Sequence, residues 1–210
     1  MTPAARKAIF SAWREANPEP RSELNYRTPF ELLVAVVLSA QATDASVNKA
    51  TARLFPVAST PRALLDLGEA GLTPYVQSIG LYRGKVKNIL ATCALLLRDH
   101  QGEVPRTREA LESLPGVGRK TANVVLNVAF GEPTIAVDTH VFRVANRVGL
   151  ARGNTPQAVE EQLLKAVPRE FLPHAHHWLI LHGRYVCVAK KPKCGACLIA
   201  RWCEYPEKTS

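Results

Sequence analysis

The stretch Leu114-Pro-Gly-Val-Gly-Arg-Lys-Thr constrains the fold more than any other part of the chain, because it joins two helical patterns through a tight turn. A periodic segment begins at Thr107, and a helix-like run extends from Arg119 to Phe130. Gly116 and Gly118 lack a Cβ, and the unpaired amides that open the second helix lie at the positive end of its dipole. The turn therefore predicts an anion site, although a glycine C-cap between two helices also explains most such turns.

Two other features of this region bear on its chemistry. A nucleotide-binding P-loop is excluded, because Gly116 and Gly118 are too close together and a helical pattern precedes them where a strand is needed. Val137-Asp-Thr-His140 begins seventeen residues after Lys120, and it places Asp138 at another predicted helix start. A candidate lysine nucleophile and a carboxylate thus each occupy the first turn of a helix.

Length and composition bound the class of protein. The 210 residues suit one large domain or two small ones, and 47% hydrophobic residues suffice for a buried core. A formal net charge of +9 favours a polyanionic partner without naming it. No apolar run approaches the roughly 20 residues of a membrane helix, and the N-terminus lacks a secretory pattern. We therefore expect a cytoplasmic protein that does not bind membranes.

Helix signals dominate the chain, and they predict about ten helices and no sheet. Thr28-Pro29-Phe30-Glu31 predicts a capping box that opens a helix apolar on every side, which is typical of the centre of a bundle. Further polar caps predict helix starts at Thr43-Asp44, Thr60-Pro61, Thr73-Pro74, Thr107, Asp138 and Thr155-Pro156. The fold class is accordingly all-α.

Four of the five cysteines form a cluster near the C-terminus. Cys187, Cys194, Cys197 and Cys203 follow the spacing C-x6-C-x2-C-x5-C, which indicates a shared metal site. Spacing alone leaves zinc and an iron-sulfur cubane as near equals, since both are held by four thiolates. Lys190, Lys191 and Lys193 lie within the cluster and either offset the thiolate charge or face phosphate. Cys93 lies at helical spacing among apolar residues and is interpreted as a core residue.

Several motifs together resemble the helix-hairpin-helix DNA glycosylases, and within them the endonuclease III branch. The motifs cover nearly the whole chain: Leu38-Ser-Ala-Gln-Ala-Thr-Asp44, Ile79-Gly-Leu-Tyr82, Leu114 to Asn123, Val137 to His140, His177-Trp-Leu-Ile-Leu-His-Gly-Arg184 and the four-cysteine spacing. One departure from the branch is Arg83-Gly84, where relatives have a small polar or basic pair without glycine.

The resemblance implies a two-lobed helical protein that holds DNA in the groove between its lobes. A six-helix lobe with the hairpin would comprise residues 22–132. The other lobe would be discontinuous, with residues 1–21 and 133–210 around one [4Fe-4S] cluster bound by the four clustered cysteines. The resemblance thus favours iron-sulfur over zinc.

The resemblance also implies a reaction and its residues. The chain would remove oxidised pyrimidines of the thymine glycol type from duplex DNA and cleave the abasic site by β-elimination. Lys120 would be the nucleophile that forms a Schiff base, and Asp138 the catalytic carboxylate. The DNA-binding residues would be the two that enter the duplex, the hairpin and the lysines of the cysteine loop: Gln41, Leu81, Leu114, Gly116, Val117, Gly118, Arg119, Lys190, Lys191 and Lys193. We further expect a monomer that is nucleoid-associated in a prokaryote-like cell.

Three alternatives compete with this interpretation, and features of the chain argue against the first two. Adenine glycosylases share the hairpin and cysteines but carry a hydroxyl residue where this chain has Lys120, and they usually have an additional C-terminal domain. A binding protein without activity would not need both Lys120 and Asp138, and a glycosylase without lyase activity would leave the strand whole.

Five histidines in the second half of the chain have no assigned role. Histidines of this kind are more often surface or buried hydrogen-bonded residues than acid-base groups. They are His140, His174, His176, His177 and His182.

Overall fold

The computed structural model describes residues 1–209, and within that range it contains ten α-helices, two short 3₁₀ helices and no strand. The all-α prediction is therefore confirmed. The chain divides into two compact units, one formed by residues 22–131 and the other by residues 1–21 together with residues 132–210.

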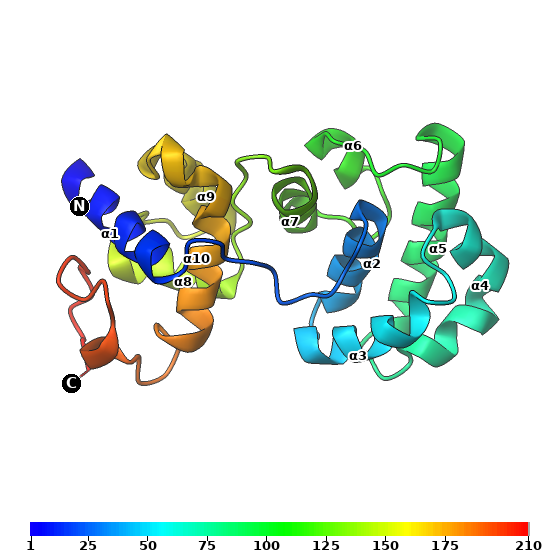
Figure 1. Ribbon diagram of the computed structural model, residues 1–210, viewed down its shortest axis with the longest axis horizontal. Coiled ribbons are helices and arrows are strands. Elements are labelled where there is room, and N and C mark those ends of the chain that lie inside the picture. The colour runs from blue at the N-terminus through cyan, green and yellow to red at the C-terminus, as the bar shows by residue number, and fades with distance from the viewer. Residues whose placement is uncertain (210) are drawn as a thin grey trace. The chain divides into compact units, whose positions relative to one another are not determined.

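The unit of residues 22–131 is built around its first helix. Its six helices are α2 (Pro29–Ser39), α3 (Asp44–Leu54), α4 (Pro61–Val76), α5 (Tyr82–Asp99), α6 (Arg108–Glu112) and α7 (Arg119–Phe130). Helix α2 packs against α3, α5 and α7 (Figure 1). Every residue from Phe30 to Leu38 is buried. The central position predicted for this apolar helix is thus the observed one.

The start of α2 differs in one hydrogen bond from the predicted capping box. The Thr28 hydroxyl accepts from the Glu31 amide at 3.1 Å, as expected. The Glu31 carboxylate, however, accepts from the Arg27 amide at 2.7 Å and from the Arg27 guanidinium at 2.8 Å, where a capping box would use the Thr28 amide. The charged guanidinium gives the buried carboxylate a stronger partner than a second amide would.

The helix start predicted at Thr73-Pro74 is wrong. Helix α4 runs through both residues and ends at Val76, and its break lies earlier, at Gly68, whose φ of 62° is left-handed. The Thr73 hydroxyl donates to the Glu69 carbonyl one turn back at 2.8 Å, as a threonine inside a helix does. The other predicted starts each open a helix at the expected residue.

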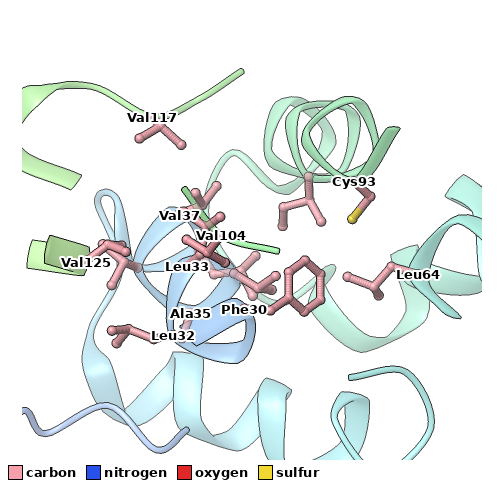
Figure 2. Packing of buried hydrophobic residues seen from close by; sticks show 14 of the residues in the cluster. Phe30, Leu32, Leu33, Ala35, Val37, Leu64, Cys93, Val104, Val117 and Val125 are labelled. Carbon is pink, nitrogen blue, oxygen red and sulfur yellow. The ribbon is translucent and has the colours of Figure 1, made fainter. Parts of the chain in front are cut away.

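The hydrophobic core of this unit includes Cys93. Its side chain is fully buried among apolar residues of α2, α4 and α5 (Figure 2). Burial raises the pKa of the Cys93 thiol to about 12. Cys93 is therefore a core residue, as its spacing predicted.

The second unit packs its helices around aromatic side chains. It contains α1 (Pro3–Ala16), α8 (Thr139–Val148), α9 (Pro156–Ala166) and α10 (Leu172–Tyr185), with 3₁₀ turns at Arg169–Phe171 and Cys194–Ala196. Phe10 of α1 contacts Trp13, Phe171 and Trp178 with ring centroids 5.1 to 6.3 Å apart. The N-terminal helix is thereby fixed in the same core as the C-terminal part of the chain.

Residues 1–209 contain no helix that combines the length and the apolar character needed to cross a membrane.

Candidate functional site

The hairpin turn between α6 and α7 is held from three directions. The Val117 amide donates to the Leu114 carbonyl at 3.1 Å, and the Thr92 hydroxyl of α5 donates to the Pro115 carbonyl at the same distance. Leu114 and Val117 are buried in the core of their unit. Their side chains therefore anchor the turn, and only their backbone groups are available to a phosphate.

Both glycines of the turn have identifiable roles. Gly116 has a φ of 78°, and a Cβ there would lie 2.8 Å from the Asn88 side chain. Gly118 is the N-cap of α7, and a Cβ there would meet nothing within 4 Å. The left-handed φ of Gly116 requires glycine at that position. At Gly118 the missing Cβ leaves the backbone amides in the first turn of α7 accessible to a ligand. The helix start is thus shaped for an anion, and the exposed Lys120 is its second residue.

Asp138 is the N-cap of α8 in the other unit. Its Oδ1 accepts hydrogen bonds from the His140 amide at 2.9 Å and the Val141 amide at 2.8 Å. These bonds leave the second carboxylate oxygen available to another group. The carboxylate is half-buried, so it has a fixed direction and remains reachable.

Gln41 and Leu81, in the unit of residues 22–131, share an unusual backbone conformation. Their φ values are 54° and 59°, although neither residue is glycine. Non-glycine residues with left-handed φ cost free energy and concentrate at functional sites. Both side chains are exposed, and Leu81 is 66% exposed, which is unusual for a leucine. The site predicted for these residues is therefore accessible to a ligand.

The four clustered cysteines are reduced, half-buried and close to one another. Cys187, Cys197 and Cys203 pack against the core of their unit. Burial raises the pKa of the Cys197 thiol, and the neighbouring Cys203, Cys194 and Cys187 raise it further. Burial likewise raises the pKa of Cys203. A shared metal cation lowers the pKa of thiols that raise one another's pKa in this way, because it stabilises all of their thiolates.

Two arginines of α8 hold the loop that carries these cysteines. Arg143 donates to the Cys187 carbonyl at 2.9 Å and to the Gly183 carbonyl at 2.8 Å. Arg147 donates to the Val188 carbonyl at 2.8 Å and lies 3.9 Å from the Cys187 sulfur. The loop therefore depends on α8 for its conformation, and it displays Lys190, Lys191 and Lys193 as exposed side chains.

His182 links α1 to the cysteine cluster. Its Nδ1 accepts a hydrogen bond from the Trp13 indole N–H at 3.3 Å, and its Nε2 lies 3.7 Å from the Cys197 sulfur. Because indole can only donate, the neutral ring must carry its proton on Nε2 and donate toward the sulfur. Burial lowers the pKa of His182 to about 4.

Known proteins with similar sequences decide the family. Residues 34–169 match the HhH-GPD superfamily of base excision DNA repair proteins, and residues 187–203 match the iron-sulfur binding domain of endonuclease III. Endonuclease III of Escherichia coli strain K12 is 62% identical over 208 residues, which cover 99% of each chain. The chain belongs to the HhH-GPD superfamily. Within it, the chain is a base excision repair enzyme of the endonuclease III type, a DNA glycosylase and abasic-site lyase.

Other relatives agree with this assignment. Endonuclease III of Haemophilus influenzae is also 62% identical over 208 residues, covering 99% of each chain. A solved structure of a trapped endonuclease III-DNA covalent intermediate has a TM-score of 0.90 and 47% identity, and the match covers 97% of this chain and 96% of that one. A thermostable thymine-DNA glycosylase has a TM-score of 0.85 at 25% identity, with 96% of each chain covered.

The cofactor of this HhH-GPD enzyme is a [4Fe-4S] cluster, and the four thiols fit it. Zinc and the cluster both need four thiolates, so the donor set alone fits either. The match of residues 187–203 to the iron-sulfur binding domain of endonuclease III decides for the cluster.

Arg143, Arg147 and His182 contact the cysteine loop, which the sequence patterns did not indicate. The atoms that they contact belong to residues 15 to 44 positions away in the chain. The available signals were the helix pattern of α8 for the arginines and the motif His177 to Arg184 for the histidine. Neither pattern says which side chain faces the cysteines.

Proposed function

We propose that Lys120 is the nucleophile and Asp138 the catalytic carboxylate with which this enzyme removes an oxidised pyrimidine and cleaves the resulting abasic site. The observation that carries the proposal is that Lys120 lies in the first turn of α7 and Asp138 is the N-cap of α8, and that both side chains are reachable. A related structure described as a trapped covalent intermediate with DNA supports covalent catalysis in this family.

The reaction begins with extrusion of the damaged nucleotide, which costs a few kcal/mol in a duplex. The open amides of α7 and the hairpin backbone bind phosphate near the lesion and fix the strand. Gln41 hydrogen-bonds the partner base that is left behind, and Leu81 replaces the lost stacking. The left-handed backbone and exposure of both residues support these roles.

Base excision is then a substitution at C1′. The deprotonated Nζ of Lys120 forms a bond to C1′ while the bond from C1′ to the base breaks, and the base leaves with the electron pair and gains a proton. The Asp138 carboxylate stabilises positive charge that develops on the sugar and relays the proton released by the amine. Its two amide hydrogen bonds hold it in place without reorganisation.

Strand cleavage follows from the same covalent bond. The C1′–O4′ bond then breaks and O4′ gains a proton, which converts the N,O-acetal at C1′ into a protonated Schiff base and acidifies the C2′ proton. Loss of that proton and breakage of the C3′–O bond release the 3′ phosphate by β-elimination. Hydrolysis of the imine then frees Lys120 for the next lesion.

In this proposal the iron-sulfur segment helps to bind the DNA backbone. Cys187, Cys194, Cys197 and Cys203 would hold the cluster, which gives the C-terminal segment a fixed structure. Arg143 and Arg147 then hold the loop backbone, and the exposed Lys190, Lys191 and Lys193 contact phosphate without reading sequence.

The domain roles and location belong to the same proposal. Residues 22–132 form the helix-hairpin-helix lobe, and residues 1–21 with 133–210 form the iron-sulfur lobe. We place the enzyme at the nucleoid in the cytoplasm, where its duplex substrate lies, and the bacterial relatives support this location.

Borohydride trapping tests the two catalytic roles. With Lys120→Gln, the trapped adduct on abasic duplex and strand cleavage should both vanish, while lesion binding persists through the hairpin and the basic loop. Asp138→Asn keeps the capping oxygen, so it should fold normally and lose about 100- to 1000-fold in base excision, with a smaller loss in cleavage of a preformed abasic site.

Two results would contradict the assignments. A trapped adduct formed by Lys120→Gln at an undiminished rate would assign the nucleophile to another amine. Equal losses of excision and abasic-site cleavage in Asp138→Asn would show that its charge is not needed for departure of the base.

A further inference from the structure

Lys85 is a buried cation in the first turn of α5, and it is 6% exposed. Its Nζ donates hydrogen bonds to the Leu38 carbonyl at 2.8 Å and to the Ala40 carbonyl at 2.5 Å. Both partners are neutral backbone groups at the end of α2. Burial lowers the pKa of Lys85, so its position costs free energy and needs an explanation other than core packing.

The end of α2 explains why a cation is needed there. The last carbonyls of a helix lack intrahelical partners and carry the negative end of its dipole. Helix α2 has no basic residue in its last turn, and its C-cap, Ala40, has a φ of −56° in place of a left-handed glycine cap. The Ser39 hydroxyl satisfies the Val36 carbonyl at 2.8 Å. Lys85 supplies donors for Leu38 and Ala40.

Lys85 is connected to Gln41 and Leu81, two of the three non-glycine residues with left-handed φ in this unit. Ala40 directly precedes Gln41, so the ammonium fixes the backbone at the start of the Gln41 turn. The Lys85 amide donates to the Leu81 carbonyl at 3.3 Å. Leu81 is the N-cap of α5 and has no side-chain cap. The two loops also approach each other, since a Cβ on Gly80 would lie 3.6 Å from the Gln41 carbonyl oxygen.

We propose that Lys85 is a positioning residue that holds the Gln41 turn and the Leu81 turn at a fixed separation, so that both side chains enter the duplex together. This inference rests on the proposed roles of Gln41 and Leu81 as the residues that fill the space left by the extruded nucleotide. Lys85 itself does not contact DNA in this proposal. It acts by keeping the Gln41 turn and the Leu81 turn at a fixed distance from each other.

The test compares a substrate that requires filling of the duplex with one that does not. Single-turnover excision is measured on a thymine glycol duplex, and cleavage is measured on a single-stranded abasic oligonucleotide, which contains no base stack to fill. Lys85→Met should lower duplex excision by about 10- to 100-fold, the effect of misplacing a group by about 1 Å. Single-strand cleavage should change by less than about threefold. Lys87→Met, which removes an exposed charge from the same helix, should change neither rate.

A double-mutant cycle separates positioning from general stability. If Lys85 acts through the Leu81 turn, Lys85→Met combined with Leu81→Ala should be no slower than the slower single variant, because coupled effects do not add. Multiplicative losses, or equal losses on both substrates, would show a merely structural role and overturn the inference. Lys85→Gln keeps two donors without the charge and serves in the cycle if Lys85→Met does not fold.

Failure of the underlying function gives a different result. If Gln41→Ala and Leu81→Ala leave duplex excision unchanged, the proposed roles of those residues fall. If those variants lower excision while Lys85→Met behaves like Lys87→Met, the roles stand and the inference about Lys85 is wrong.

Discussion

His177 shows how a single buried residue couples this enzyme to pH. Its side chain is 8% exposed on α10, and within the described residues its Nδ1 has no hydrogen-bond partner. Burial and, to a smaller extent, the charge of His174 together lower the pKa of His177 from 6.5 to about 4. The ring is therefore neutral in the folded protein across the physiological range.

This burial predicts a loss of stability in acid. Between pH 6.5 and about 4 the unfolded chain binds a proton at His177 that the folded chain does not, so the free energy of unfolding falls as pH falls. Above pH 6.5 the ring is neutral in both states and the full stability remains. At pH 5 the loss from this residue should be about 2 kcal/mol.

The measurement is urea unfolding at pH 7.5 and pH 5.0. His177→Phe cannot titrate, so its free energy of unfolding should fall by about 2 kcal/mol less than that of the wild type over this interval. Comparing the two pH values within each protein removes the packing effect of the substitution. An equal fall in both proteins would assign the acid sensitivity to other groups.

At the scale of elements, sequence patterns predict the helix caps, because their hydrogen bonds join residues that are close in the chain. The caps at Thr43, Thr60, Thr107, Asp138 and Thr155 were predictable because each bonds an amide two or three residues away. The start predicted at Thr73 failed because the same residue type also bonds a carbonyl one turn back inside a helix. Local signals do not separate these two uses of threonine.

Side chains that act over long separations could not be predicted in this way. Lys85 bonds carbonyls 45 and 47 positions away, and Trp13 bonds His182 across 169 positions. Their partners are determined by packing, not by periodicity. The all-α fold class was predicted from helix caps and apolar periodicity, and the enzyme class from a resemblance carried by several motifs, whereas the roles of the individual site residues stay predictions.

The space around two helix glycines, Gly183 in α10 and Gly84 in α5, predicts opposite effects of substitution by alanine. A Cβ on Gly183 would lie 2.8 Å from His140 Cβ and 3.2 Å from His140 Cα, so Gly183→Ala should destabilise the protein by about 1–3 kcal/mol. A Cβ on Gly84 in α5 would meet nothing within 4 Å. Gly84→Ala should therefore stabilise the protein by about 0.5–1 kcal/mol through helix propensity.

Thermal or urea unfolding of the two glycine variants checks both signs, and each variant is the control for the other. The Gly84 result also bears on the departure at Arg83-Gly84, because α5 continues through this position without a break. If Gly183→Ala is as stable as the wild type, α8 and α10 can separate without cost and their crossing is not tightly packed. A destabilised Gly84→Ala would show that the first turn of α5 needs glycine for a reason other than space.

At the scale of the whole molecule, the net charge of +9 indicates a DNA-binding surface only where exposed basic side chains lie close together. Lys190, Lys191 and Lys193 are exposed within four residues of one another, on a loop held by Arg143 and Arg147. Cations fixed at such density contact a phosphate backbone simultaneously and release its counterions. The cysteine loop therefore concentrates positive charge that the composition gives only as a total for the whole chain.

The salt dependence of DNA binding tests this surface. Each lysine that neutralises a phosphate adds about 0.9 to the negative slope of log affinity against log salt concentration, so changing all three lysines to glutamate should lower that slope by about 2.7. Each change removes two units of charge, which takes the formal net charge from +9 to +3. Binding to undamaged and damaged duplexes should weaken alike, because phosphate contacts carry no sequence information.

A charge-matched variant makes the result specific to the loop. Lys49, Lys87 and Lys165 are exposed and lie on three different helices. Changing them to glutamate gives the same net charge of +3, and none of the three belongs to the cysteine loop or to the hairpin residues 114–119. This control should keep nearly the wild-type slope. Equal reductions in both triple variants would mean that DNA responds to the net charge of the protein, and the proposed role of the cysteine loop in binding phosphate would then be wrong.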